Sequence, residues 1–270
     1  MCNINESCRM KRIVLGVEYI GAGYHGWQKQ DNLSTVELHV EMALSKVADS
    51  PVKIYCAGRT DVGVHALGQV IHFDTSVSRN DKSWIMGANT YLPKAIRVQW
   101  AKEVSLDFHA RFSAIARWYR YFIYNSVVHS AILHDRVTCH YHTLDVNKMQ
   151  AAASYLLGEH DFSSFRGAGC QSKSPNRFVE FIKIERQGFI ISIDVKANAF
   201  LLHMVRNIVG VLTEIGEGKK PPIWAKEVLE AKNRTFGAIT AKPEGLYLMS
   251  VDYPEKYFLP KSIEYKPIIF

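Results

Sequence analysis

The order of its periodic segments is the feature that most constrains the fold of this chain. From Ile13 to Tyr19, apolar side chains alternate as in a strand with one buried face. Ser34 and Glu37 have the spacing of a capping box, and apolar residues follow at helical spacing to about Ala48. A strand, a second strand, a helix and a third strand follow, at residues 52–56, 69–74, 82–91 and 96–100. This order is that of a ferredoxin-like βαββαβ unit.

The second half of the chain repeats this plan of elements. A long aromatic strand, a helix, a hairpin, two helices and a last strand are predicted at residues 115–124, 146–157, 178–196, 200–215, 224–231 and 246–253. We therefore expect an α+β fold: two ferredoxin-like βαββαβ halves with antiparallel sheets side by side, helices behind them and an active-site cleft between the halves. The predicted parts are a flexible N-terminal extension at 1–11, an N-terminal half at 12–107 that carries the catalytic loop, and a C-terminal half at 108–270 that completes the cleft.

Composition narrows the class of protein. A chain of 270 residues with 47% hydrophobic content can bury a substantial core. No apolar run has the length that crosses a bilayer, and the N-terminus lacks the apolar core of a signal peptide, so we expect a cytoplasmic protein with no membrane segment. The net charge of +7 suits a polyanionic partner.

Cysteine and histidine spacing indicates neither disulfides nor a metal site. The five cysteines are scattered, and no two have Cys-x-x-Cys spacing. His140 and His142 lie near Cys139, but a strand with alternating, solvated histidines accounts for them more simply than a metal site.

The segment Cys-Ala-Gly-Arg-Thr-Asp-Val-Gly-Val-His-Ala, residues 56–66, points to chemistry. Arg59, Thr60 and Asp61 lie in a predicted loop between two apolar strands. Since Arg59 is two residues from Asp61, both side chains can face the same way, which favours an ionised carboxylate suited to a nucleophile or an electrostatic stabiliser. From the spacing alone, an ordinary ion pair in a loop is the favoured interpretation.

As a string, residues 57–66 resemble the signature of the tRNA pseudouridine synthase A family, whose aspartate in that motif is catalytic. Six further segments resemble that family in the same order, at residues 23–30, 108–114, 119–121, 161–165, 203–207 and 245–248. Two positions depart from the family pattern: Glu37 replaces a common glutamine, and Leu202 stands where a histidine often precedes His203. The resemblance implies a homodimeric isomerase without cofactor or metal, a tRNA pseudouridine(38-40) synthase, which isomerises uridine at positions 38, 39 and 40 of the anticodon stem-loop.

The implied reaction breaks the C1′–N1 bond of uridine, turns the base and joins C1′ to C5. One carboxylate, Asp61, is enough, because the base itself returns to C1′ and no water needs activation. By resemblance, Arg59 takes the place of the extruded base, Tyr119 stacks on it, Arg206 pairs with the catalytic aspartate and Leu246 forms an apolar wall of the pocket. Whether Asp61 attacks C1′ or assists an elimination stays open.

Without the resemblance, other interpretations of these side chains remain. Tyr119 is also typical of a cross-strand aromatic, and Arg206 of an arginine that snorkels from an apolar helix. For contact with tRNA the sequence offers basic residues in predicted loops, namely Arg166, Lys173, Arg177, Lys219 and Lys220, with Arg79 and Lys82.

Two functions of other classes compete with the synthase. A non-catalytic RNA-binding protein on the same fold is an alternative, although the Gly-Phe-Gly-Phe strand motif of such proteins is missing. A phosphotransferase would need a phosphate loop of the Gly-Lys-Ser/Thr type, which the sequence lacks.

Overall fold

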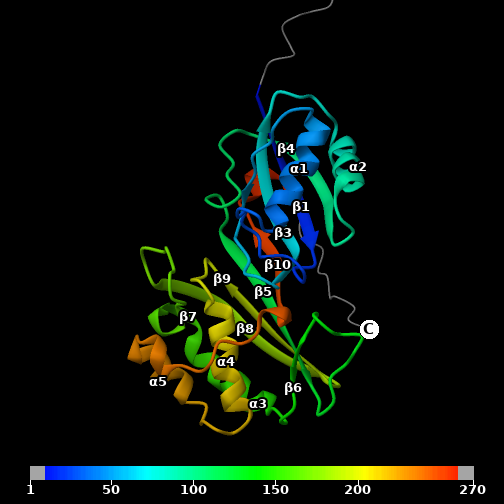
Figure 1. The fold of residues 1–270 in the computed structure, drawn as a ribbon. Coiled ribbons are helices and arrows are strands. Elements are labelled where there is room, and N and C mark those ends of the chain that lie inside the picture. Colours follow the sequence, from blue (N-terminus) through cyan, green and yellow to red (C-terminus); the bar gives the residue numbers. More distant parts are fainter. Residues whose placement is uncertain (1–9, 261–270) are drawn as a thin grey trace, which may run out of the picture. The chain divides into compact units, whose positions relative to one another are not determined.

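The computed structural model of the protein describes residues 10–260 (Figure 1). All but the last two residues of the predicted N-terminal extension therefore lie outside the described part, and the first strand begins at Lys11. The chain forms two compact units: unit 1 takes residues up to 115 and from 248 onward, and unit 2 takes residues 116–247. The sequence-based halves meet instead between residues 107 and 108, a division that stays a prediction.

Unit 1 is built on an antiparallel core of three strands with two helices. Its elements in chain order are β1 (Lys11–Tyr19), α1 (Val36–Ala48), β2 (Tyr55–Cys56), β3 (His65–Thr75), α2 (Asp81–Tyr91) and β4 (Ile96–Val104). In the sheet, β1 lies between β4 and β3, and β3 also pairs with the short β2 and neighbours β10 (Leu246–Asp252). The expected βαββαβ order is confirmed. Strand β3 begins four residues earlier than predicted, so His65 and Ala66 belong to the sheet rather than to the loop.

Both faces of the unit 1 sheet are buried, whereas the sequence predicted one buried face. Residues 13–17 of β1 are all buried. On one face, Phe73 of β3 packs edge-on against Trp84 of α2, with 5.1 Å between ring centroids. On the other face, Val14 packs in a cluster with Phe108 and Tyr257. The segments after β4 and β10 thus cover the face that the helices leave open.

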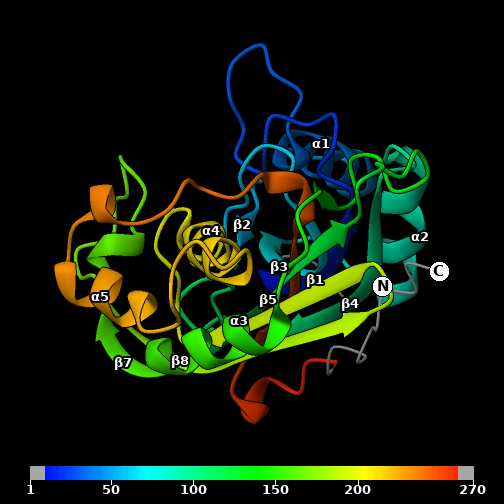
Figure 2. The ribbon, with the colours of Figure 1, turned by 90° about the horizontal axis from the view of Figure 1, so that it is seen from below.

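Unit 2 contains a four-stranded antiparallel order with helices packed on it. Its elements are β5 (Ala116–Asn125), β6 (Thr138–His140), α3 (Val146–Ala153), β7 (Gly158–Asp161), β8 (Asn176–Gln187), β9 (Ile190–Ala197), α4 (Met204–Gly216) and α5 (Trp224–Ala231). The strand order is β5-β9-β8-β7, and β6 pairs with β5 in parallel. Helix α3 contacts both β8 and α4 (Figure 2). Within residues 10–260, each helix is too short or too polar to cross a membrane.

Two local predictions need correction. Thr35, not Ser34, caps α1: its hydroxyl accepts the N–H of Leu38 at 3.4 Å, while the Ser34 hydroxyl contacts His39. His140 does lie in a strand, β6, but it is not solvated, because its Nε2 atom lies 3.1 Å from a carboxylate oxygen of Glu217 and its side chain is only 18% exposed. In both cases tertiary packing chose the partner.

Candidate active site

The signature segment leaves the sheet of unit 1 after β2 and returns to it at β3. The N–H of Ala57 donates to the Val70 carbonyl at 2.8 Å, which anchors the start of the loop to β3. The loop closes with a turn in which the N–H of Val64 donates to the Asp61 carbonyl at 3.1 Å. Gly63 lies inside this turn at φ 81°, a backbone angle that glycine adopts without strain. Asp61 is therefore the first residue of a tight, hydrogen-bonded turn.

A buried polar network holds the loop between Ala57 and Asp61. The Tyr19 hydroxyl of β1 lies 2.8 Å from the Thr60 hydroxyl, and the Gln69 amide of β3 donates to the Gly58 carbonyl at 2.6 Å. Gln69 is fully buried, and Thr60 is 7% exposed. Buried polar groups are costly unless they are paired, so these contacts favour one backbone position for the residues that precede Asp61.

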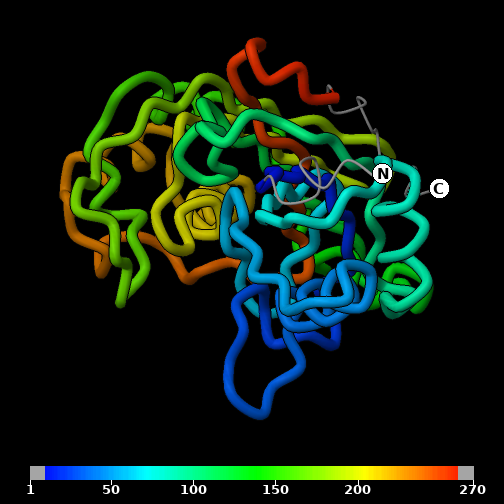
Figure 3. The backbone as a smooth tube through the Cα atoms, turned by 90° about the horizontal axis from the view of Figure 1, so that it is seen from above, coloured from blue at the N-terminus to red at the C-terminus, as the bar shows by residue number. Residues whose placement is uncertain are grey.

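The glycine-rich segment after β1 packs directly on the same loop. It extends as a long loop between β1 and α1, drawn in blue in Figure 3. A Cβ atom at Gly21 would lie 2.0 Å from the Val64 carbonyl oxygen, so no larger residue fits there. The Gly21 N–H donates to His65 Nδ1 at 3.0 Å, and the Trp27 N–H donates to the Thr60 carbonyl at 3.0 Å. The two motifs therefore form one packed substructure.

The side chains of the signature loop differ in exposure. Asp61 is half-buried and Arg59 is exposed. Between them, Thr60 is anchored inward and the chain turns at Asp61, and the pairing of Arg59 with Asp61 stays a prediction. Burial raises the pKa of the neighbouring Cys56 thiol to about 12, so this cysteine stays protonated and is a poor nucleophile at neutral pH. The role of Asp61 as the nucleophile of this segment stays a prediction.

Unit 2 places the other predicted site residues on its strands and helices. Tyr119 lies in β5, half-buried, with its ring edge-on to Phe200 at 5.0 Å between centroids. Arg206, in the first turn of α4, is half-buried and donates from Nε to the Ala241 carbonyl at 2.8 Å. Leu246 begins β10 and is 6% exposed. All three residues belong to unit 2, and their catalytic roles stay predictions.

Three of the predicted RNA-contacting residues of unit 2, within residues 166–177, differ in their exposure and in their contacts. Arg166 donates to the carbonyls of Cys170 and Ser172, at 2.7 and 2.8 Å, and thereby holds its own loop. Arg177 is 9% exposed and donates to the Ser172 hydroxyl. The predicted phosphate contact of Arg177 is therefore not supported. Lys173, between these arginines, is exposed.

Sequence reasoning missed the residues that position the loop. Tyr19, His65 and Gln69 all lie in strands of unit 1 and bond to backbone or side chains of the motif segments. The available signal was weak: Gln69 is a polar residue at the start of an apolar run, and His65 belongs to the signature itself. Their partners could be identified only when the strands were placed together.

Comparison with known proteins identifies relatives of this chain. A family model described as "tRNA pseudouridine synthase" matches residues 16–113 and 152–254. The chain is 56% identical over 252 residues to "tRNA pseudouridine synthase A" of Coxiella burnetii, covering 93% of this chain and 97% of the relative. Proteins of the same name from Pseudoalteromonas atlantica and Hydrogenovibrio crunogenus are 55% and 53% identical, over 93% and 94% of this chain and 95% and 97% of each relative.

Proposed function

The chain belongs to the tRNA pseudouridine synthase family and is an isomerase, and we propose that it converts uridine to pseudouridine at positions 38, 39 and 40 of the anticodon stem-loop. The placement of Asp61 carries the proposal. This carboxylate is half-buried at a tight turn, and a buried polar network fixes the residues before it. A group held in one position needs little reorganisation when it meets the reacting carbon.

The chemistry needs one such carboxylate. The C1′–N1 bond of uridine breaks, the base turns, a C1′–C5 bond forms, the C5 proton leaves to solvent and N1 takes up a proton. Asp61 is the proposed nucleophile at C1′, where positive charge develops as in glycoside hydrolysis. Its carboxylate oxygen would bond to C1′ as the C1′–N1 bond breaks, and this new bond would break when C5 joins C1′. The bonds broken and formed balance without an oxidant or reductant, so the reaction needs no redox cofactor, and we propose that it uses no cofactor.

The remaining roles follow the resemblance of the motifs. A target uridine inside a stem must leave its stack, which costs a few kcal/mol. We assign Arg59, which is exposed beside Asp61, to the vacated position and Tyr119 to stacking on the extruded base. Arg206 is the proposed cationic group of the catalytic set and Leu246 an apolar wall. Lys173 is the proposed phosphate contact, on a loop that Arg166 holds.

Tritium release from tRNA labelled at uridine C5 tests this function. We expect release by the wild-type protein and none by Asp61→Asn, with tRNA binding retained by both. Asp49→Asn is the matched control, because Asp49 is an exposed aspartate of unit 1 at the C-terminus of α1, where asparagine tolerates the same left-handed backbone. This control should release tritium at the wild-type rate.

The opposite result would favour the alternative function. If the wild-type protein binds tRNA and releases no tritium, it is a non-catalytic RNA-binding protein on this fold. If Asp61→Asn releases tritium as the wild type does, Asp61 is not the catalytic carboxylate.

The proposed partners are tRNA and a second copy of the chain, and the proposed compartment is the cytoplasm. Cys56, Cys139 and Cys170 are free thiols, as is usual in a reducing compartment.

A further inference from the structure

A cluster of aromatic rings in unit 1 joins β2, β3 and the segment after β4. Tyr55 of β2 stacks on His72 of β3, with 5.1 Å between centroids and 19° between ring planes. His109 lies 4.7 Å from His72 and 5.6 Å from Tyr55, and Phe112 lies 4.3 Å from His109. We call Tyr55, His109 and Phe112 the aromatic platform.

The platform is not part of the hydrophobic core. Phe112 is 75% exposed and Tyr55 is 44% exposed. Exposing such large rings together loses the free energy that their burial would provide, and clusters of this kind usually mark a binding surface. A ligand that covers the rings would recover that free energy.

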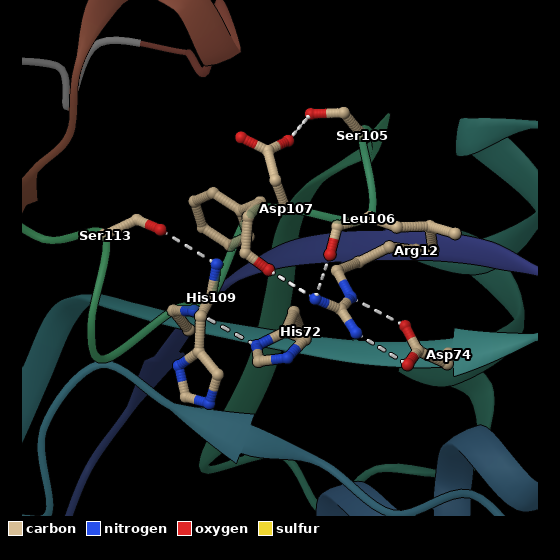
Figure 4. A network of polar contacts seen from close by, with 10 residues as sticks. Arg12, His72, Asp74, Ser105, Leu106, Asp107, His109 and Ser113 are labelled. Carbon is tan, nitrogen blue, oxygen red and sulfur yellow. Dashed lines mark hydrogen bonds and ion pairs between the residues drawn. The ribbon is translucent and has the colours of Figure 1, made fainter.

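The segment that carries His109 and Phe112 is held rigidly to the sheet (Figure 4). Arg12 of β1 donates to the carbonyls of Leu106 and Phe108, both at 2.6 Å, and forms a two-bond ion pair with Asp74. His72 Nδ1 accepts the N–H of Ala110 at 3.1 Å.

Within the segment, His109 Nδ1 accepts the N–H groups of Arg111 and Phe112, at 3.1 and 3.4 Å. The Ser113 hydroxyl accepts the N–H of His109 at 2.9 Å. The rings are therefore fixed before a ligand arrives, which lowers the entropy cost of binding.

The charges around the platform suit a polyanion. The Lys53 ammonium lies 5.7 Å from the centroid of Tyr55, and the Arg111 guanidinium lies 5.6 Å from that of Phe112. Two acids of the segment and the neighbouring strand pair with cations: Asp74 with Arg12 and Asp107 with Lys256. Surfaces that bind single-stranded nucleic acid combine aromatic rings, on which bases stack, with cations that contact the phosphates.

We propose that Tyr55, His109 and Phe112 form a stacking site for an unpaired nucleotide of the bound tRNA, with Lys53 and Arg111 facing its phosphates. The choice of RNA as ligand rests on the proposed function. Cys56, the residue after Tyr55, begins the signature segment, so one ring of the site lies on the strand that leads into the catalytic loop. The site adds affinity for the substrate and takes no part in bond making.

Binding of tRNA to Phe112 variants tests the site. We expect Phe112→Ala to raise the dissociation constant for tRNA about tenfold at fixed salt, as loss of one base–aromatic stack does. The dissociation constant of Phe112→Trp should stay within about twofold of the wild-type value. Phe258→Ala is the matched control: Phe258 is 77% exposed in unit 1 with Lys102 over its ring at 5.7 Å, and within residues 10–260 no histidine or tyrosine ring stacks beside it. It should bind as wild type.

Two further measurements separate this proposal from its alternatives. Tritium release at saturating tRNA should be normal for Phe112→Ala, with the defect confined to low tRNA concentration. Active wild-type protein with unchanged affinity in Phe112→Ala would overturn the stacking site and leave the synthase function standing. If the wild-type protein is inactive and Phe112→Ala lowers its affinity for tRNA, the stacking site is supported while the synthase function fails.

Light scattering tests whether the platform is instead a protein interface. If Phe112→Ala changes the oligomeric state and leaves tRNA affinity unchanged, the platform is such an interface and the proposal is wrong.

Discussion

At the scale of single residues, buried polar side chains of unit 1 form hydrogen bonds to the backbone of neighbouring segments. His72 is the clearest case: it is 1% exposed, and its Nδ1 atom accepts the N–H of Ala110 from the segment after β4. Burial, followed by the charges of Arg12 and His109, lowers the pKa of His72 to about 4, although Asp74 opposes the shift. A neutral imidazole is what this acceptor role requires.

His72 should therefore make stability depend on pH. Between pH 4 and 6.5 the unfolded chain binds a proton at this residue and the folded protein does not, so the free energy of unfolding rises with pH. The stabilisation that comes from a neutral His72 is fully present above pH 6.5 and is lost as the pH drops toward 4. It changes the free energy of unfolding by about 3 kcal/mol between these pH values.

Urea unfolding of wild type and His72→Asn across this window measures the effect. Asparagine keeps an acceptor near the position of Nδ1 and cannot titrate, so the variant should show the flatter pH dependence. Equal slopes for the two proteins would contradict the assignment.

At the scale of elements, α1 shows how a neighbouring loop selects the helix start. Two adjacent hydroxyls could cap it, and the buried Thr35 does so, while Ser34 contacts His39 and Glu37 accepts the N–H of Lys29. The carbonyls of Gly26 and Trp27 accept the first N–H groups of the helix, at 3.2 and 3.0 Å. The loop that packs on the signature segment therefore also fixes where α1 begins.

This arrangement predicts different effects at two neighbouring positions. Thr35→Val keeps the shape and removes the capping oxygen, so it should lower the free energy of unfolding by about 1 kcal/mol. Ser34→Ala should change it by less than about 0.5 kcal/mol, as an exposed substitution usually does. Urea unfolding of both variants, with Thr35→Ser as the variant that retains the cap, decides the point; equal losses at the two positions would restore Ser34 as the cap.

At the scale of the whole molecule, the chain closes unit 1 with its C-terminal segment. Strand β10 neighbours β3, and Val251, Tyr253 and Tyr257 pack on the sheet face that Phe108 covers. Tyr253 also donates its hydroxyl proton to the Ala110 carbonyl at 2.6 Å. In the sequence, unit 2 is thus an insertion within unit 1, whose core takes residues from both sides of the insertion.

The proposed homodimer is a prediction at this scale. A tRNA is large beside a chain of 30.7 kDa, and a second copy would let one subunit hold the tRNA body while the other receives the stem-loop. Size-exclusion chromatography with light scattering should give about twice the chain mass across a wide range of concentrations. A stable monomer that releases tritium would contradict the dimer.

Much of the fold could be predicted because the relevant signals are local. Alternation with period two and helical spacing located β1, α1, α2, the β8–β9 hairpin and β10. Short β7 carries too few residues for a period and was not predicted. The motif around Asp61 identified the family for a related reason, since its residues are contiguous in the chain.

By itself, then, the sequence determined the order of elements, the family and the candidate carboxylate. Only the tertiary structure decided which polar groups are partners: Tyr19 and Thr60 are 41 residues apart, and Arg12 and Phe108 are 96 apart. It also decided that Arg177 is buried while Lys173 is exposed, and that Tyr55, His109 and Phe112 share one surface. The physical reason is that burial and hydrogen bonding depend on which segments meet in space, and periodicity along the chain contains no information about that meeting.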